Sequence, residues 1–81
     1  MIEHLLGINI KKLRKHHKLT QEQLADIIGA KKLQISRWEQ GTVVPDSYMI
    51  QRISDYFNIP VHILIRGIIT FDENINITDD I

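Results

Sequence analysis

The 81-residue chain contains no cysteine, which excludes disulfides, thiolate metal sites and cysteine nucleophiles. It also lacks any apolar run close to the roughly 20 residues that cross a bilayer, so we expect no membrane partner. Its first ten residues lack the basic start and unbroken apolar stretch of a secretory signal, because Glu3 and Gly7 interrupt them. Together these absences predict a cytoplasmic protein that is stabilised by side-chain packing alone.

A net charge is absent as well, since ten basic residues balance ten acidic ones. The two signs are nevertheless segregated along the chain. Residues 1–41 hold eight Lys or Arg and four acidic residues, whereas residues 42–81 hold two and six. One half can therefore face a polyanion, although such segregation fits many functions besides nucleic-acid binding.

The spacing of apolar residues predicts five short helices and an all-α fold. Thr20 and Gln23 form a capping box that starts the second helix, and Gly29 ends it in the left-handed conformation that glycine adopts at little cost. The expected helices span residues 5–17, 21–28, 32–39, 46–57 and 60–66. A chain of this length supports one modest core, which we expect to close at residue 67.

Residues 68–81 have a different character. Ile69, Phe71, Ile75 and Ile77 partly alternate with polar and acidic residues, which is typical of a β-strand. The domain organisation that we expect is thus a helical domain over residues 1–67, followed by a tail over residues 68–81 that is either a dimerisation strand or a linker.

The second and third helices carry the spacing of a helix-turn-helix. Counted from Gln21 as the first position, the small residue Ala25 stands fifth, Gly29 ninth, the branched residue Ile35 fifteenth and Trp38 eighteenth. A helix-turn-helix needs a close helix crossing, a tight turn and apolar anchors at these positions, so that its second helix can enter the major groove of DNA.

The run LGINIKKLRKHHKLTQEQLADIIGAKKLQISRWEQGTVVPD resembles the Xre or Cro/repressor family of phage and bacterial regulators, most specifically in LTQEQLA and ISRWEQG. The resemblance covers about residues 6–66. It implies a five-helix, lambda-repressor-like DNA-binding domain and a sequence-specific transcriptional regulator. Of the two kinds of regulator, we expect a repressor. The resemblance also implies a homodimer on a palindromic double-stranded DNA operator, without a cofactor.

The resemblance assigns contacts to the helix expected at 32–39. Lys32 and Arg37 can donate to guanine O6 and N7, Leu33 can meet a thymine methyl group, and Ser36 completes the base-contacting set. The phosphate-contacting residues implied in the same way are Gln21, Lys31, Gln34 and Gln40.

Arg14 and Glu39 match positions that form a partly buried ion pair in the family, so we expect a structural role for them. Lys18 and Lys31, by contrast, depart from the family pattern. Lys18 stands where many relatives have glycine, and it must adopt an unfavourable backbone angle or another turn. Lys31 stands where relatives have Ser or Thr, and it offers no acceptor to cap the next helix, a loss of about 1 kcal/mol.

Two other classes of function can be compared with this interpretation of the sequence. An enzyme or a metal site is not expected, because the histidines at 4, 16, 17 and 62 are dispersed along the chain. An antitoxin-type interaction module, which binds DNA for autoregulation and a protein partner through residues 68–81, is the alternative function. The tail could also add a strand across a dimer interface, which we favour, lie on its own domain, or lead into a larger protein.

Overall fold

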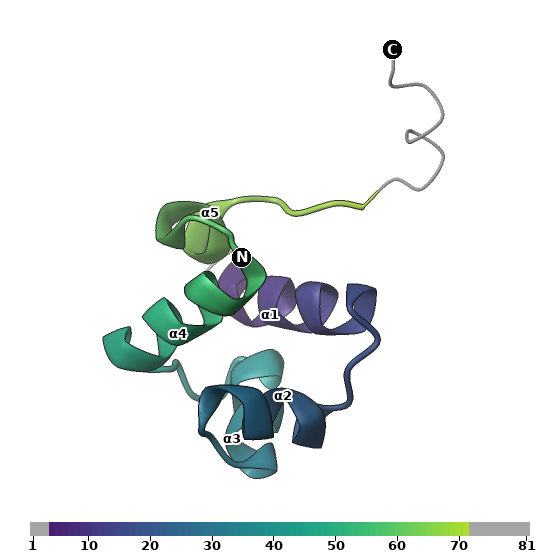
Figure 1. Cartoon of the computed structure of the whole chain (residues 1–81). Coiled ribbons are helices and arrows are strands. Elements are labelled where there is room, and N and C mark those ends of the chain that lie inside the picture. Colours follow the sequence, from purple (N-terminus) through teal and green to yellow (C-terminus); the bar gives the residue numbers. More distant parts are fainter. Residues whose placement is uncertain (1–3, 72–81) are drawn as a thin grey trace.

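The computed structural model describes residues 4–71, and within them the chain forms five helices and no strand (Figure 1). The helices are α1 (Leu5–His16), α2 (Gln21–Ile28), α3 (Lys32–Gln40), α4 (Ser47–Phe57) and α5 (Val61–Arg66). The predicted all-α, five-helix fold is confirmed, with each boundary within about two residues of expectation. None of these helices is long and apolar enough to cross a membrane.

Local signals set the start and the end of α2. The Thr20 hydroxyl accepts a hydrogen bond from the Gln23 backbone N–H (3.0 Å), and the Gln23 side chain accepts one from the Thr20 N–H (2.8 Å). Gly29 follows the helix with a φ of 78°, in the left-handed region. The capping box and the glycine stop are therefore formed as predicted.

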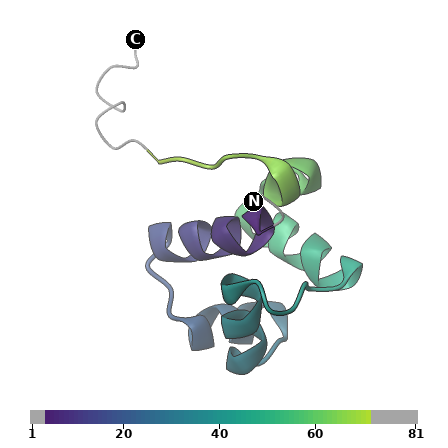
Figure 2. The same cartoon turned by 180° about the vertical axis from the view of Figure 1, so that it is seen from behind.

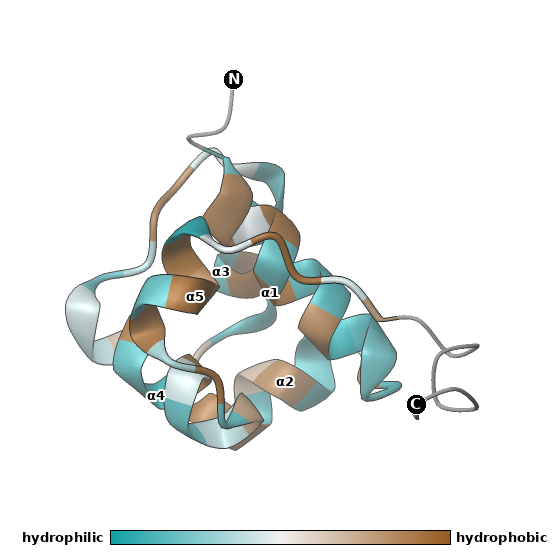
Figure 3. Ribbon diagram, turned by 90° about the horizontal axis from the view of Figure 1, so that it is seen from above, coloured by the Kyte–Doolittle hydropathy of each residue, from teal (hydrophilic) through white to brown (hydrophobic). Residues whose placement is uncertain are grey.

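The helices pack into one core. α1 contacts α3 and α5, α2 contacts α3 and α4, and α4 contacts α5. Apolar and polar stretches alternate along the helices in Figure 3, as they do in amphipathic helices with one buried face. The buried apolar side chains are Leu6, Ile10, Leu13, Leu24, Ala25, Ile28, Ile35, Trp38, Ile53, Phe57, Leu64 and Ile69.

Residues 68–71 continue from α5 along α1, on the opposite side from α2 and α3 (Figures 1 and 2). Ile69 is buried in the core, the Lys12 ammonium donates to its carbonyl oxygen (3.0 Å), and the Phe71 ring stacks on His16 at 3.7 Å between centroids. The core thus includes a residue beyond the expected boundary at 67. The β-strand predicted for the tail is not formed over 68–71, and residues 72–81 lie outside the described range.

These contacts predict different outcomes for two truncations. A chain that ends at residue 67 should lose about 2 kcal/mol of unfolding free energy relative to one that ends at residue 71, because it lacks the buried Ile69 side chain. For a domain of this size that corresponds to roughly 10 °C in melting temperature. Thermal unfolding followed by circular dichroism measures the difference, and equal melting temperatures would contradict the role given to Ile69.

Lys18, between α1 and α2, has a φ of 59°, so of the two outcomes expected at this position the structure has the unfavourable backbone angle. A non-glycine residue costs about 1–2 kcal/mol in this region because its Cβ approaches the following carbonyl oxygen. Lys18→Gly should therefore raise the unfolding free energy by about 1 kcal/mol. Asn58 has the same φ, 58°, and provides the matched control. Asn58→Gly should change stability less, since asparagine tolerates this conformation, and urea unfolding of both variants compares them.

Candidate nucleic-acid interface

The connection between α2 and α3 has the geometry that the residue spacing predicts. Three residues separate the two helices, and the first of them, Gly29, is left-handed. Ala25 is buried where the helices pack, and its carbonyl oxygen accepts the Ala30 N–H at 2.8 Å. On α3 the inner side chains Ile35 and Trp38 are buried. The small residue, the turn and both anchors occupy the expected places, which confirms the helix-turn-helix.

The outer side of α3 presents the residues that the resemblance assigned to base contacts. Lys32, Leu33 and Arg37 are exposed and Ser36 is half-buried, while Leu33 is 57% exposed despite its apolar side chain. Their spacing places the four on one side of the helix, away from the buried Ile35 and its neighbours. The structure therefore brings the four residues together on a single free surface.

Ser36 is joined to a residue that was predicted only as a phosphate contact. The Gln40 side-chain amide donates to the Ser36 hydroxyl oxygen at 3.2 Å. This bond leaves the Ser36 hydroxyl proton and the second Gln40 N–H available for other partners. The i, i+4 spacing on a helix could have indicated the pair from the sequence.

The start of α3 is capped from one direction only. The Lys31 side chain has no acceptor, so no side chain caps the α3 amides from this position, whereas the Gln34 side chain accepts the Lys31 backbone N–H at 2.9 Å. Half of a capping box is therefore present. Gln34, predicted as a phosphate contact, has this structural role as well, and its place three residues after the cap was the signal for it.

Arg14 of α1 and Glu39 of α3 form a buried, two-contact ion pair. The Arg14 Nε lies 2.6 Å from Glu39 Oε2 and its Nη2 lies 3.0 Å from Oε1, with the side chains 10% and 4% exposed. Arg14 Nη1 also donates to the Leu19 carbonyl oxygen at 2.8 Å. The pair ties the end of α3 and the α1–α2 turn to the first helix.

Gln21, at the start of α2, also contacts this ion pair. Its side-chain amide donates to Glu39 Oε1 at 3.1 Å, and the side chain is half-buried. The sequence predicted a phosphate contact at Gln21 but not this bond, because no local pattern relates positions 18 residues apart. One carboxylate thus accepts from α1 and α2 at once, and its charge is matched by the Arg14 guanidinium.

The histidines of the chain lie outside α3, which carries the candidate base-contacting residues. The His4 Nε2 donates to the Glu39 carbonyl oxygen at 3.1 Å, and His17 contacts the Leu13 carbonyl oxygen through Nδ1 at 2.9 Å. Within residues 4–71, no group of three or more His, Asp or Glu side chains is arranged to hold a metal ion. Both histidine contacts are to backbone carbonyl oxygens, and we assign them a structural role.

The chain matches a family model described as helix-turn-helix over residues 10–64. It is 42% identical over 55 residues to the antitoxin PezA of Streptococcus pneumoniae, which covers 68% of this chain and 35% of that protein. It is 35% identical over 69 residues to the transcriptional activator BcrR of Enterococcus faecalis, covering 83% and 34% respectively. The chain therefore spans about a third of the length of these two curated relatives.

Among solved structures the fold is similar to that of the P22 c2 repressor, crystallised with a synthetic operator. The TM-score is 0.75 at 26% identity, and the match covers 79% of this chain and 97% of the repressor chain. The helix-turn-helix described above lies within the matched family region.

Proposed function

The chain belongs to the helix-turn-helix family, and from that premise we propose that it is a sequence-specific DNA-binding transcriptional regulator, a repressor, that reads the major groove with α3. The proposed activity is binding alone, without a catalytic step. A repressor that is similar in fold was crystallised with operator DNA, which supports the choice of ligand. The observation that carries the proposal is the free surface formed by Lys32, Leu33, Ser36 and Arg37 on α3.

The chemistry of this surface fits base edges in the major groove. The Arg37 guanidinium can donate two parallel hydrogen bonds to guanine O6 and N7, and the Lys32 ammonium can donate to the same atoms. The apolar side chain of Leu33 is exposed to solvent, and the methyl group of thymine is an apolar partner for it. The Ser36 hydroxyl retains a proton with which to donate. We propose these four side chains as the base-reading set.

The backbone of the DNA would contact the ends of α2 and α3. Gln21 keeps a second side-chain N–H after its bond to Glu39, and Gln34 keeps both of its own, so each can donate to a phosphate oxygen. Lys31 and Gln40 flank α3 at its two ends. The Arg14 guanidinium neutralises the Glu39 carboxylate, which reduces its repulsion of nearby phosphates. We propose Gln21, Lys31, Gln34 and Gln40 as the phosphate-contacting set.

Arg37→Ala tests the assignment of the base contacts. It should cost about 1–3 kcal/mol of binding to the preferred site and relax the preference at one base position, because a two-bond contact to guanine is lost. Gln21→Ala should instead weaken binding to all sequences alike, because a phosphate contact carries no sequence information.

Selection of bound sites from a random DNA library with each variant measures both effects. If the sites selected by Arg37→Ala equalled those of the unchanged protein, Arg37 would not read a base. A uniform loss for both variants would place Arg37 among the phosphate contacts.

A homodimer on a palindromic operator is the assembly we propose. Two copies of α3 would then lie about one helical turn of DNA apart, and half-site spacing in the selected DNA reports this directly. The role of the tail in dimerisation is tested by light scattering on the full chain and on a chain that ends at residue 71, because truncation at 67 would also remove Ile69 from the core. A dimer that is unchanged after removal of residues 72–81 would exclude strand exchange through that segment.

The alternative function, an antitoxin-type module, has one specific observation in its favour, the 42% identity to an antitoxin over 55 residues. An antitoxin would suppress the toxicity of a toxin protein that is expressed with it. If residues 68–81 bound that protein, deletion of residues 72–81 would abolish the suppression and leave operator binding intact. Operator binding without any such suppression would leave the regulator as the function.

A further inference from the structure

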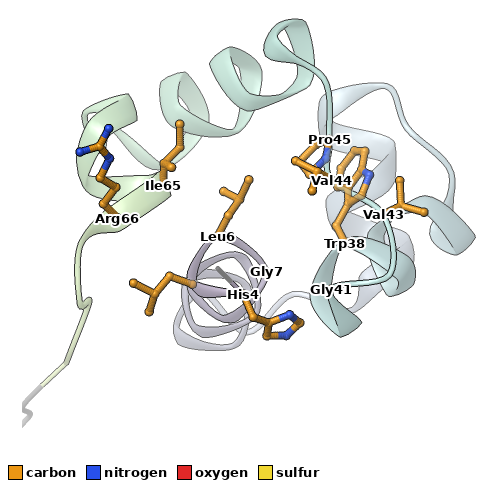
Figure 4. Close-up of a pocket in the computed structure, with 11 residues that line it drawn as sticks. His4, Leu6, Gly7, Trp38, Gly41, Val43, Val44, Pro45, Ile65 and Arg66 are labelled. Carbon is orange, nitrogen blue, oxygen red and sulfur yellow. The ribbon is translucent and has the colours of Figure 1, made fainter. Parts of the chain in front are cut away.

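A pocket of about 360 Å³ lies on the molecule at a place that the proposed DNA contacts do not use. It opens between the first turn of α1, the C-terminal end of α3, the loop before α4 and the end of α5 (Figure 4). Its volume lies within the roughly 300–1,000 Å³ of small-molecule sites in proteins. Within residues 4–71 no side chain fills it.

The walls of the pocket are predominantly apolar. Leu6 projects into it from α1, Ile65 borders it from α5, and Trp38, Val44 and Pro45 form the opposite side (Figure 4). Val44 is 71% exposed, so an apolar side chain at the rim of the pocket contacts water. Such a surface favours an apolar occupant, because its contact with water is removed on binding.

Among residues 4–71, the lining of the pocket contains no acidic side chain, whereas it contains the basic side chain of Arg66 and the imidazole of His4. The His4 ring is held beside Gly41 by its bond to the Glu39 carbonyl oxygen. The Arg66 guanidinium, at the α5 edge of the pocket, makes no hydrogen bond or ion pair to any residue from 4 to 71. It can therefore turn toward an anion without breaking another contact.

We propose that this pocket binds a small apolar carboxylate, with the hydrocarbon part between Leu6, Trp38 and Ile65 and the carboxylate paired with Arg66. A planar guanidinium matches a carboxylate with two parallel hydrogen bonds, which favours this anion over a neutral or cationic head group. The lining residues within 4–71 include no acidic side chain that would repel a carboxylate, which points to the same class of ligand. The binding is separate from the proposed DNA contacts and can be measured without DNA.

The test uses the only tryptophan of the chain, Trp38, which lines the pocket. Titration of the full chain with octanoate should change Trp38 fluorescence saturably, and octylamine should not. Arg66→Gln should weaken octanoate binding roughly fivefold, the scale of an exposed ion pair, and leave the weaker binding of octanol unchanged. No saturable change with octanoate, or equal affinity for octanoate and octylamine, would overturn the proposal.

A second pair of variants guards against indirect effects. Val44→Glu places a negative charge at the pocket on an exposed side chain, and it should abolish octanoate binding while the domain stays folded. Ile68→Glu makes the same change at a residue that is 77% exposed and does not line the pocket, and it should bind octanoate normally. Equal binding by both variants would refute the site. If instead Val44→Glu alone dissociated a dimer of the ligand-free protein, the occupant would be a second copy of the chain and the carboxylate proposal would fail.

Discussion

Replacement of Glu39 with alanine should lower the free energy of unfolding by about 3–5 kcal/mol. The reason is that the variant leaves the Arg14 guanidinium buried without its counter-charge, and removal of one partner from a buried ion pair costs this much. Gln21 also loses the acceptor of its side-chain amide. Against a typical total of 5–15 kcal/mol for a domain, such a loss would unfold much of the protein near physiological temperature. Urea unfolding followed by circular dichroism measures the change.

The matched control is the double variant Arg14→Met with Glu39→Met. It removes both charges together and fills the space of the two side chains with apolar ones. It should be more stable than Glu39→Ala, because replacement of both members of a buried pair by apolar side chains is often close to neutral. Here the Leu19 carbonyl oxygen also loses its Arg14 donor, so some loss remains. If Glu39→Ala cost less than about 1 kcal/mol, the pair would contribute no more than a surface salt bridge.

Gly7→Ala should destabilise the domain by about 3 kcal/mol, although alanine is normally favoured over glycine inside a helix by about 1 kcal/mol. A Cβ at Gly7 would overlap the backbone carbonyl oxygen of Trp38 and lie 3.3 Å from that of Glu39. Backbone atoms cannot rotate aside as a side chain can. The first helix would have to move away from the end of α3, and the packing between them would be lost.

Lys11→Ala provides the control, because it introduces the same side chain on the exposed side of the same helix. It should alter the unfolding free energy by no more than about 0.5 kcal/mol. Thermal unfolding of both variants separates a steric effect at position 7 from a general effect of alanine in α1. A Gly7→Ala protein as stable as the unchanged chain would show that the two helices can move apart without cost.

Much of the fold could be predicted because its signals are local. The capping box at Thr20 and the glycine stop at Gly29 set the limits of α2 through residues at most four apart, and both features are present. The helix-turn-helix spacing placed Ala25, Ile35 and Trp38 at the contact between helices, where they are buried. The unfavourable backbone angle at Lys18 was one of two outcomes that followed from the resemblance, because many relatives have glycine at this position.

The side-chain partners within the candidate site were harder to predict. Gln21 and Glu39 are separated by 18 residues and by a turn, so their hydrogen bond depends on how α2 and α3 cross. Gln34 and Gln40 were assigned to phosphate contacts alone, yet Gln34 accepts from the Lys31 N–H and Gln40 donates to the Ser36 hydroxyl. These contacts are decided by rotamers in the folded chain, and a residue pattern records only which types are present.

The C-terminal part shows the same division. The sequence predicted a core that closes at residue 67 and a β-prone tail, on the basis of composition. Ile69 is nevertheless buried, and Lys12 and His16 of α1 contact residues 69 and 71. The face of α1 that receives this segment is 50 or more residues away in sequence, so composition alone could not reveal it.

The lack of cysteine excluded disulfides and thiolate sites, and the local patterns determined the five helices and the helix-turn-helix. Short-range hydrogen bonds and backbone angles carry that information, and they can be read from neighbouring residues. Only the tertiary structure decided the bond from Gln21 to Glu39, the close approach at Gly7 and the pocket beside Trp38. Each of these arises where helices distant in sequence pack together, and their relative placement depends on the whole core at once.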